Sequence, residues 1–193
     1  MKNTLLMVTE ASYSLNFLVY IQNIFLNQGQ TRDDLKFPYI PIKYGFREDF
    51  EMQYRELWDE ISKRLSEHRL DDLNIFTEEK YLFYQSLFVE KNDALEEFNE
   101  LYKSFKVWWR SFTGQFSVER SVDEKGQEIY AELSSFLLEK KVKPQKELNI
   151  SIIYDECLLA DLKPTPYFAI LSVNDCILNY KEIIQKLKDM LKG

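Results

Sequence analysis

An apolar stripe at helical spacing between residues 48 and 68 is the feature that most constrains the fold. Its members recur at the intervals of one face of an α-helix, and they are Tyr54, Leu57, Trp58, Ile61 and Leu65. We therefore predict one long amphipathic helix over residues 48–68. Such a helix must pack its apolar face against a core, so we expect a folded globular protein rather than a disordered chain.

The first half of the chain contains two more helical patterns. Residues 4–27 are dense in Leu, Ile, Val, Phe and Tyr on almost all sides, which predicts a buried helix preceded by a short extended piece at residues 5–8. Asp93 and Glu96 resemble a capping box, and the broad apolar face that follows predicts a helix that ends at Gly114. We therefore expect a helical body up to about residue 113.

The segment after Gly114 fits two interpretations. Residues 121–124 could cap a helix, whereas residues 122–127 also resemble a hairpin turn with Gly126 at its left-handed position. Apolar residues alternate with polar ones on both sides of this turn, as expected of a half-buried pair of strands. We therefore favour a hairpin over residues 116–133, followed by a short helix.

The last part of the chain predicts strands and a closing helix. Residues 148–154 and 167–173 are runs of β-branched and aromatic residues of strand length, and residues 178–191 repeat apolar side chains at helical spacing. The expected fold class is therefore α+β and predominantly α-helical. We expect a helical body followed by a small antiparallel sheet and a C-terminal helix.

The sequence shows no clear domain boundary. No internal repeat or linker-like segment is present, so we expect residues 1–193 to form a single domain. The alternative is a subdivision into a helical part, residues 1–113, and an α+β part, residues 114–193. Near the start there is neither a signal sequence nor a run of about 20 apolar residues, so we expect a cytoplasmic protein that does not cross a membrane.

Several kinds of catalytic and cofactor site are disfavoured. The five glycines are scattered, so no glycine-rich phosphate loop can be written, and His68 is the only histidine available for nucleophilic catalysis. Cys157 and Cys176 have neither C-x-x-C spacing nor neighbouring histidines. We expect them to be reduced and buried, with a disulfide or a reactive thiol as the alternatives, and we expect no cofactor and no bound metal.

Carboxylate chemistry is the one enzymatic alternative. Asp155 and Glu156 follow the first predicted strand of the last third, and Asp161 and Lys163 lie in the loop to the next strand. Carboxylates near strand ends can hold a metal that activates water, and a lysine can neutralise developing negative charge. These four residues would be the site of a metal-dependent nuclease or hydrolase.

Negative charge is concentrated in the middle of the chain. The whole chain has 25 Lys and Arg against 32 Asp and Glu, a net charge of −7, while residues 48–100 alone carry 16 acidic and 6 basic residues, a balance of −10. On the predicted helix of residues 48–68, the acidic residues opposite the apolar stripe are Asp49, Glu56, Glu60 and Glu67. One helical face is therefore predicted to be acidic.

These observations favour a binding protein over an enzyme. We expect a non-catalytic interaction or regulatory protein, such as an inhibitor, an immunity-type protein or an adaptor, that presents the acidic face of Asp49, Glu56, Glu60 and Glu67 to a basic protein partner. Nucleic acid is an unlikely ligand for so acidic a chain, although a mimic of DNA phosphates that inhibits a DNA-binding protein is a further alternative. The aromatic helical faces leave homodimerisation open.

Overall fold

The computed structural model describes residues 5–29, 35–41, 43–163 and 165–191, which divide into two units with separate sets of contacts. The sheet unit is formed by the described residues of segments 1–12, 115–156 and 162–193. The helical unit is formed by residues 13–114 and 157–161. Each unit is therefore built from segments that are distant in the sequence.

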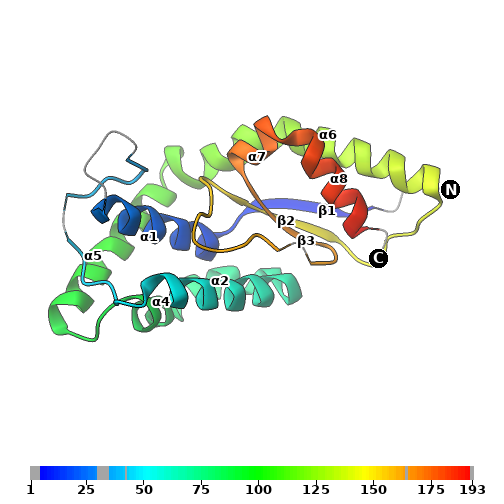
Figure 1. Ribbon diagram of the computed structural model, residues 1–193. Helices are drawn as coiled ribbons and strands as arrows, with labels where there is room; N and C mark the ends of the chain where they lie inside the picture. Colours follow the sequence, from blue (N-terminus) through cyan, green and yellow to red (C-terminus); the bar gives the residue numbers. More distant parts are fainter. Residues whose placement is uncertain (1–4, 30–34, 42, 164, 192–193) are drawn as a thin grey trace. The chain divides into compact units, whose positions relative to one another are not determined.

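The helical unit contains the long amphipathic helix that the apolar stripe predicts. This helix is α2 (Phe50–Glu67), and its buried residues include Tyr54, Leu57, Trp58, Ile61 and Leu65. Around it in the sequence are α1 (Tyr13–Gly29), the short 3-10 helix η1 (Arg69–Asp71), α3 (Asp72–Thr77), α4 (Lys80–Leu87) and α5 (Asn92–Trp109) (Figure 1). The buried helix predicted over residues 4–27 corresponds to α1, but it starts later, because residues 7–11 form a strand.

An aromatic core holds the helical unit together. Phe17 on α1 lies 5.0–5.6 Å, between ring centroids, from four rings on α3, α4 and α5: Phe76, Phe83, Tyr102 and Phe105. Edge-to-face and tilted aromatic pairs at such separations contribute about 0.5–1.5 kcal/mol each beyond the area they bury. Phe17 therefore joins three other helices to α1.

Buried amide side chains on α1 hold two loops against the helical unit. Gln22 Oε1 accepts the backbone N–H groups of Leu158 and Leu159 at 2.7 and 3.1 Å. Asn27 Nδ2 donates to the carbonyl of Lys36 at 2.7 Å, and Asn27 Oδ1 accepts the Lys36 N–H at 2.9 Å. Loop backbone packed on a buried helix needs such partners, because an unpaired buried N–H or C=O group is costly.

The sheet unit contains three parallel strands, so the prediction of an antiparallel sheet is wrong. The strands β1 (Met7–Ala11), β2 (Leu148–Ile153) and β3 (Phe168–Ser172) lie in the order β1-β2-β3. Both pairs are parallel, with Thr9 opposite Ile150 and Ile150 opposite Ala169. The two strands predicted in the last third of the chain are confirmed as β2 and β3. The third strand, β1, comes from the beginning of the chain. The segment between β2 and β3 crosses back to the end of the sheet where β2 starts, so the two strands run in the same direction. Sequence periodicity identifies strands without giving the direction in which they pair.

The hairpin favoured for residues 116–133 is also wrong, because this segment is helical. A short helical turn η2 (Phe112–Phe116) leads into α6 (Ser117–Lys140), which also includes most of the short helix expected next. The buried side chains of α6 include Val118, Val122, Ile129, Leu133 and Leu137, spaced by four or seven residues as on one helix face. Gly126 has no positive φ and lies inside the helix rather than at a turn.

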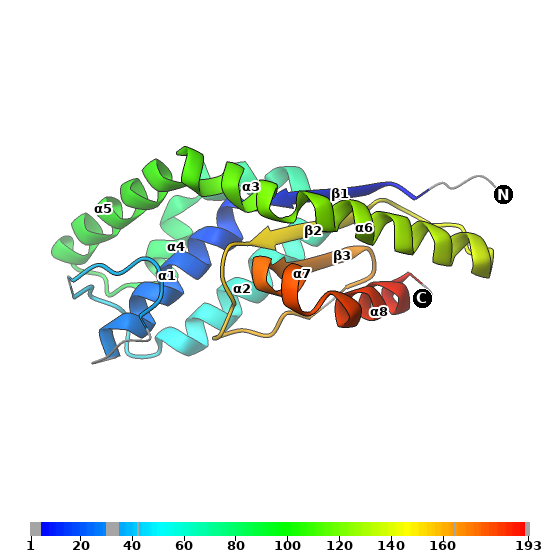
Figure 2. The same cartoon turned by 90° about the horizontal axis from the view of Figure 1, so that it is seen from above.

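The helices of the sheet unit cover one face of the sheet. Figures 1 and 2 show α6, α7 (Val173–Leu178) and α8 (Tyr180–Met190) on the same side of the strands. Ser172 caps α7 in a reciprocal capping box with Asp175. In the part of the chain that the structure describes, no helix combines the length and the apolar character needed to cross a membrane.

Candidate functional site

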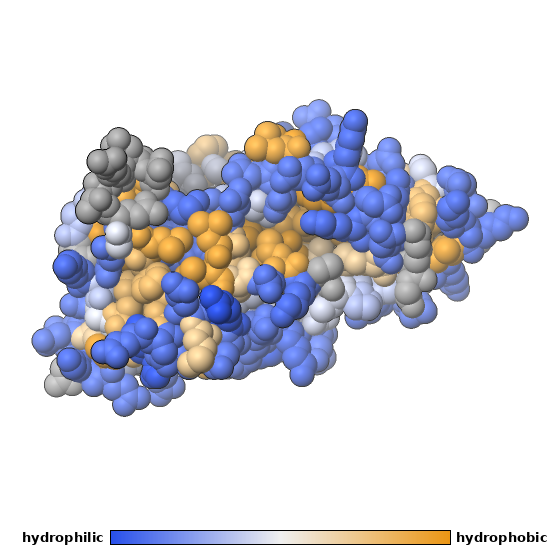
Figure 3. All heavy atoms as spheres, viewed as in Figure 1, coloured by the Kyte–Doolittle hydropathy of each residue, from blue (hydrophilic) through white to orange (hydrophobic). Residues whose placement is uncertain are grey.

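The acidic face predicted on α2 is exposed at three of its four positions. Glu56, Glu60 and Glu67 are exposed, and Asp49, which directly precedes α2, is half-buried. The lower part of the surface in Figure 3, where α2 and α4 lie, is mostly hydrophilic. The buried stripe of α2 fixes the orientation of this face, because the apolar side chains on the opposite side are locked in the core.

Arginines neutralise part of this face. Arg47 donates to both carboxylate oxygens of Asp49, from Nε at 2.8 Å and from Nη2 at 3.1 Å. These hydrogen bonds hold the pKa of Asp49 below its usual value. Asp49 is therefore engaged within its own chain, and it contributes less to a partner surface than the sequence predicts.

Glu60 has a weaker partner. Arg64 Nη1 lies 3.9 Å from Glu60 Oε1, but the guanidinium of Arg64 donates to both oxygens of Glu79 at 2.8 and 2.6 Å. The bidentate pair lowers the pKa of Glu79 and raises that of Arg64. Among the described residues, Glu56 and Glu67 have no ion-pair partner, so they are the most available acids of the predicted face.

The four residues of the alternative metal site are not brought together within one unit. Asp155 and Glu156 follow β2 directly, and the Glu156 N–H donates to Asp155 Oδ1 at 2.8 Å. Lys163 belongs to the same unit, whereas Asp161 belongs to the helical unit. Across the described residues, no group of three or more His, Cys, Asp and Glu side chains is arranged to hold a metal ion. The geometry therefore gives the nuclease or hydrolase hypothesis no support.

The N-terminus of α1 is occupied by a carboxylate of the chain itself. Asp72 Oδ2 accepts the Tyr13 N–H at 2.6 Å, Asp72 Oδ1 accepts the Ser14 N–H at 3.0 Å, and the Ser14 hydroxyl donates to the Asp72 carbonyl at 3.0 Å. In nucleotide-binding α/β proteins, the helix after the first strand offers these N–H groups to phosphate. Here the carboxylate of Asp72 stands where the phosphate would bind, and it would repel a second anion. This agrees with the absence of a glycine-rich loop from the sequence.

Both cysteines are free thiols. Burial raises the pKa of Cys157 to about 11 and the pKa of Cys176 to about 12. The thiolate is the nucleophilic form, so neither group is activated for catalysis at neutral pH. Tyr54 Oη lies 3.8 Å from Cys157 Sγ within the helical unit.

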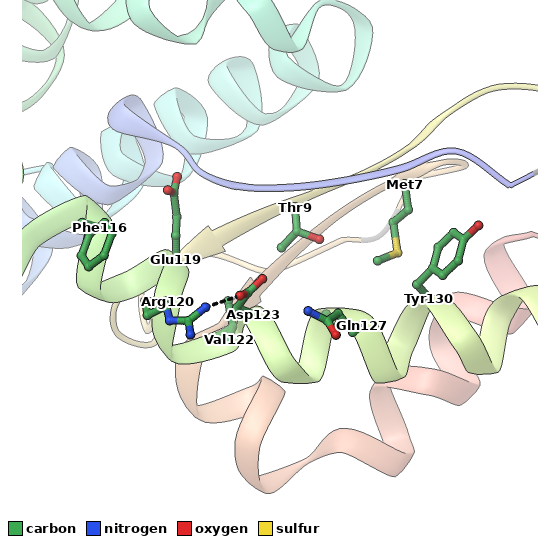
Figure 4. Close-up of a pocket in the computed structure, with 10 residues that line it drawn as sticks. Met7, Thr9, Phe116, Glu119, Arg120, Val122, Asp123, Gln127 and Tyr130 are labelled. Carbon is green, nitrogen blue, oxygen red and sulfur yellow. Dashed lines mark hydrogen bonds and ion pairs between the residues drawn. The ribbon is translucent and has the colours of Figure 1, made fainter.

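A groove between β1 and α6 is a site that the sequence analysis missed. It has a volume of about 730 Å³ and is lined from β1 by Met7 and Thr9, and from α6 and the residue before it by Phe116, Glu119, Arg120, Val122, Asp123, Gly126, Gln127 and Tyr130. Figure 4 shows Met7 and Thr9 pointing from β1 toward α6. The missed signal was the spacing of Val118, Val122 and Ile129, which would have identified α6 and with it one wall of the groove.

Comparison of this chain with protein-family models, with curated proteins and with solved structures found no match in any of the three.

Proposed function

We propose that this chain is a non-catalytic interaction protein that presents the exposed acidic face of α2 to a basic protein partner. The observation that carries the proposal is the exposure of Glu56, Glu60 and Glu67 on a helix whose opposite side is buried. A surface of this kind steers a basic partner and accelerates association through complementary potentials.

The charge balance supports the same assignment. Residues 48–100 carry ten more acidic than basic residues, and this surplus exceeds the net charge of −7 of the whole chain. The internal ion pairs of Asp49 and Glu79 leave Glu56 and Glu67 uncompensated among the described residues. The proposed binding surface therefore contains three of the four predicted residues, Glu56, Glu60 and Glu67, and leaves out Asp49.

Charge reversal on α2 tests the proposal. The triple variant Glu56→Lys, Glu60→Lys, Glu67→Lys is compared with the triple variant Glu124→Lys, Glu139→Lys, Glu182→Lys, which changes three exposed carboxylates elsewhere and has the same net charge. Proteins captured from lysate at low salt are quantified by mass spectrometry. We expect the α2 variant to lose a basic partner at least about tenfold and the control variant to keep it.

The salt dependence tests whether charge drives the capture, and the control variant separates the α2 face from net charge. Capture by the unmodified chain should fall as the ionic strength rises, because exposed charges are screened. Equal capture by the unmodified chain and the α2 variant contradicts the proposal. Equal loss in both triple variants also contradicts it, because net charge rather than the α2 face would then control binding.

A further inference from the structure

The outer edge of β1 has backbone groups with no partner in the described chain. The Leu148 N–H donates to the Leu6 carbonyl at 2.9 Å, which shows that the backbone groups of Leu6 point toward β2. In a parallel ladder the backbone groups of successive residues point alternately to the two sides of a strand, so those of Met7, Thr9 and Ala11 point away from β2. The Ala11 N–H is accepted by Glu119 Oε1 at 3.1 Å, which agrees with this alternation.

The two edges of the sheet are closed to different extents, and on β3 only the outward backbone groups of Ile170 lack a partner among the described residues. On β3, Phe168 exchanges two backbone hydrogen bonds with Thr165, at 3.0 and 3.2 Å, and the Ser172 N–H donates to Asp175 Oδ2 at 3.2 Å. On β1, Glu119 closes only the Ala11 position. Edge strands are usually protected by such contacts, by prolines or by bulges, and Met7 and Thr9 have none of these.

The space beside this edge is large enough for an extended segment. The volume of about 730 Å³ lies within the range of about 300–1,000 Å³ that is usual for ligand sites. Gly126 contributes to this space, because a Cβ atom there would meet only Thr9 Oγ1, at 3.9 Å. Apolar parts of the Met7 and Tyr130 side chains line the groove and offer contacts to alternate residues of a strand.

The charge of the lining favours a basic occupant. Glu119 and Asp123 supply two carboxylates against the single guanidinium of Arg120, which donates to Asp123. Both hydrogen bonds received by Glu119, from the Ala11 N–H and from Gln115 Nε2, go to Oε1. The second oxygen of Glu119 is left to accept a hydrogen bond from an ammonium or guanidinium group.

We propose that the β1 edge and the β1–α6 groove bind an extended, basic segment of a partner protein by strand addition. The segment pairs its backbone with Met7 and Thr9, lays alternate apolar side chains against Met7 and Tyr130, and places a basic side chain near Glu119. Main-chain hydrogen bonds supply affinity in this mode of recognition, and the side-chain contacts supply specificity. This site is independent of the acidic face of α2.

A designed peptide tests the pairing directly. The probe is the fluorescein-labelled peptide Lys-Val-Thr-Val-Thr-Lys, with a blocked C-terminus, titrated into the full chain at low salt and followed by fluorescence polarisation. One version is N-methylated at both valine amides and another at both threonine amides. Strand addition predicts saturable binding that one methylated version loses and the other keeps, because only alternate amides face β1. Absence of saturable binding, or equal binding of both methylated versions, overturns the proposal.

Variants of the groove and of the peptide charge complete the test. Gly126→Trp fills the groove and should weaken binding at least tenfold, whereas Gly126→Ala should change it less than threefold. A probe with Glu in place of both Lys residues should bind at least tenfold more weakly. If Gly126→Trp lowers the melting temperature strongly, amide chemical shifts in the unmodified chain decide: Met7 and Thr9 should shift on binding. Shifts centred away from β1, or protection of these two amides by dimerisation without peptide, overturn the proposal.

Discussion

Asp72 decides what the N-terminus of α1 can bind. Its carboxylate accepts two of the first backbone N–H groups of the helix, and its own carbonyl accepts the Ser14 hydroxyl. A helix N-terminus carries a partial positive charge, so the carboxylate is favourable there and leaves no anion site. No local pattern reveals this contact, because Asp72 lies 59 residues from Tyr13 in the chain.

The substitution Asp72→Ala should therefore destabilise the chain. Loss of a side chain that caps a helix N-terminus costs about 0.5–2 kcal/mol of unfolding free energy. The matched control is Asp71→Ala, since Asp71 makes no side-chain cap hydrogen bond at α3. Urea unfolding followed by circular dichroism measures both variants. A stability for Asp72→Ala equal to that of Asp71→Ala would show that the cap contributes nothing.

The Arg64–Glu79 pair gives the stability a pH dependence. Hydrogen bonds from Arg64 lower the pKa of Glu79 in the folded state below the ordinary value of 4.5. The stabilisation is therefore present above about pH 4.5 and is lost as the pH falls through the lower pKa of the folded state. Both side chains are about one-third exposed, so the contribution is at most about 1 kcal/mol.

Replacing Glu79 should reduce the loss of stability at acid pH. In Glu79→Gln the melting temperature should fall less between pH 5 and pH 3 than in the unmodified chain, because the titrating carboxylate is gone. Glu78→Gln serves as the control, because this neighbouring exposed carboxylate lies outside the Arg64–Glu79 pair. An equal fall in melting temperature between pH 5 and pH 3 for Glu79→Gln and the unmodified chain would exclude a stabilising role for the pair.

Single residues also show the limit of charge patterns in the sequence. The helical wheel places Asp49 on the acidic face, but Arg47, two residues earlier, binds both of its oxygens. Glu79, which lies outside α2, receives both guanidinium hydrogen bonds of Arg64, so Glu60 keeps only a longer ion pair with Arg64. Side-chain pairing of this kind depends on backbone direction at helix ends, which composition and periodicity do not give.

Among the elements, α2 and α6 explain why one helix was predicted and the other was not. Five bulky apolar residues recur along α2 at helical spacing, so its period is unambiguous. In α6, Gly126 and the polar residues around it interrupt the apolar face and imitate a hairpin turn. The strands β2 and β3 were recognised from their composition, but their parallel pairing depends on the loop between them and on β1.

Two glycines should respond oppositely to alanine. Gly126 lies inside α6 with space for a Cβ atom, so Gly126→Ala should raise the unfolding free energy by about 0.5–1 kcal/mol through helix propensity. At Gly114, a Cβ atom would collide with the backbone carbonyl oxygens of Trp108 and Trp109, so Gly114→Ala should destabilise the chain. Thermal unfolding of the two variants is the measurement, and destabilisation by Gly126→Ala would contradict the interior helical position.

At the scale of the whole molecule, negative charge is concentrated in one of the two units. The surplus of ten acidic residues in residues 48–100 belongs to the helical unit. Some of these acidic residues form ion pairs within the chain, as Glu79 does with Arg64, whereas Glu56 and Glu67 are exposed. The parallel order of the sheet could not be predicted, because it joins residues 7–11 to residues 148–153 across most of the chain.

Site-specific photo-cross-linking tests the central claim most directly, namely that the acidic face of α2 contacts a basic partner. A photoreactive amino acid replaces Glu56 or Glu67 in one experiment and Glu124, an exposed carboxylate of α6, in the control. We expect irradiation in cells to give a cross-linked product with a basic protein from positions 56 and 67 and not from position 124. Cross-linking from position 124 alone, or from none of the three positions, would contradict the claim.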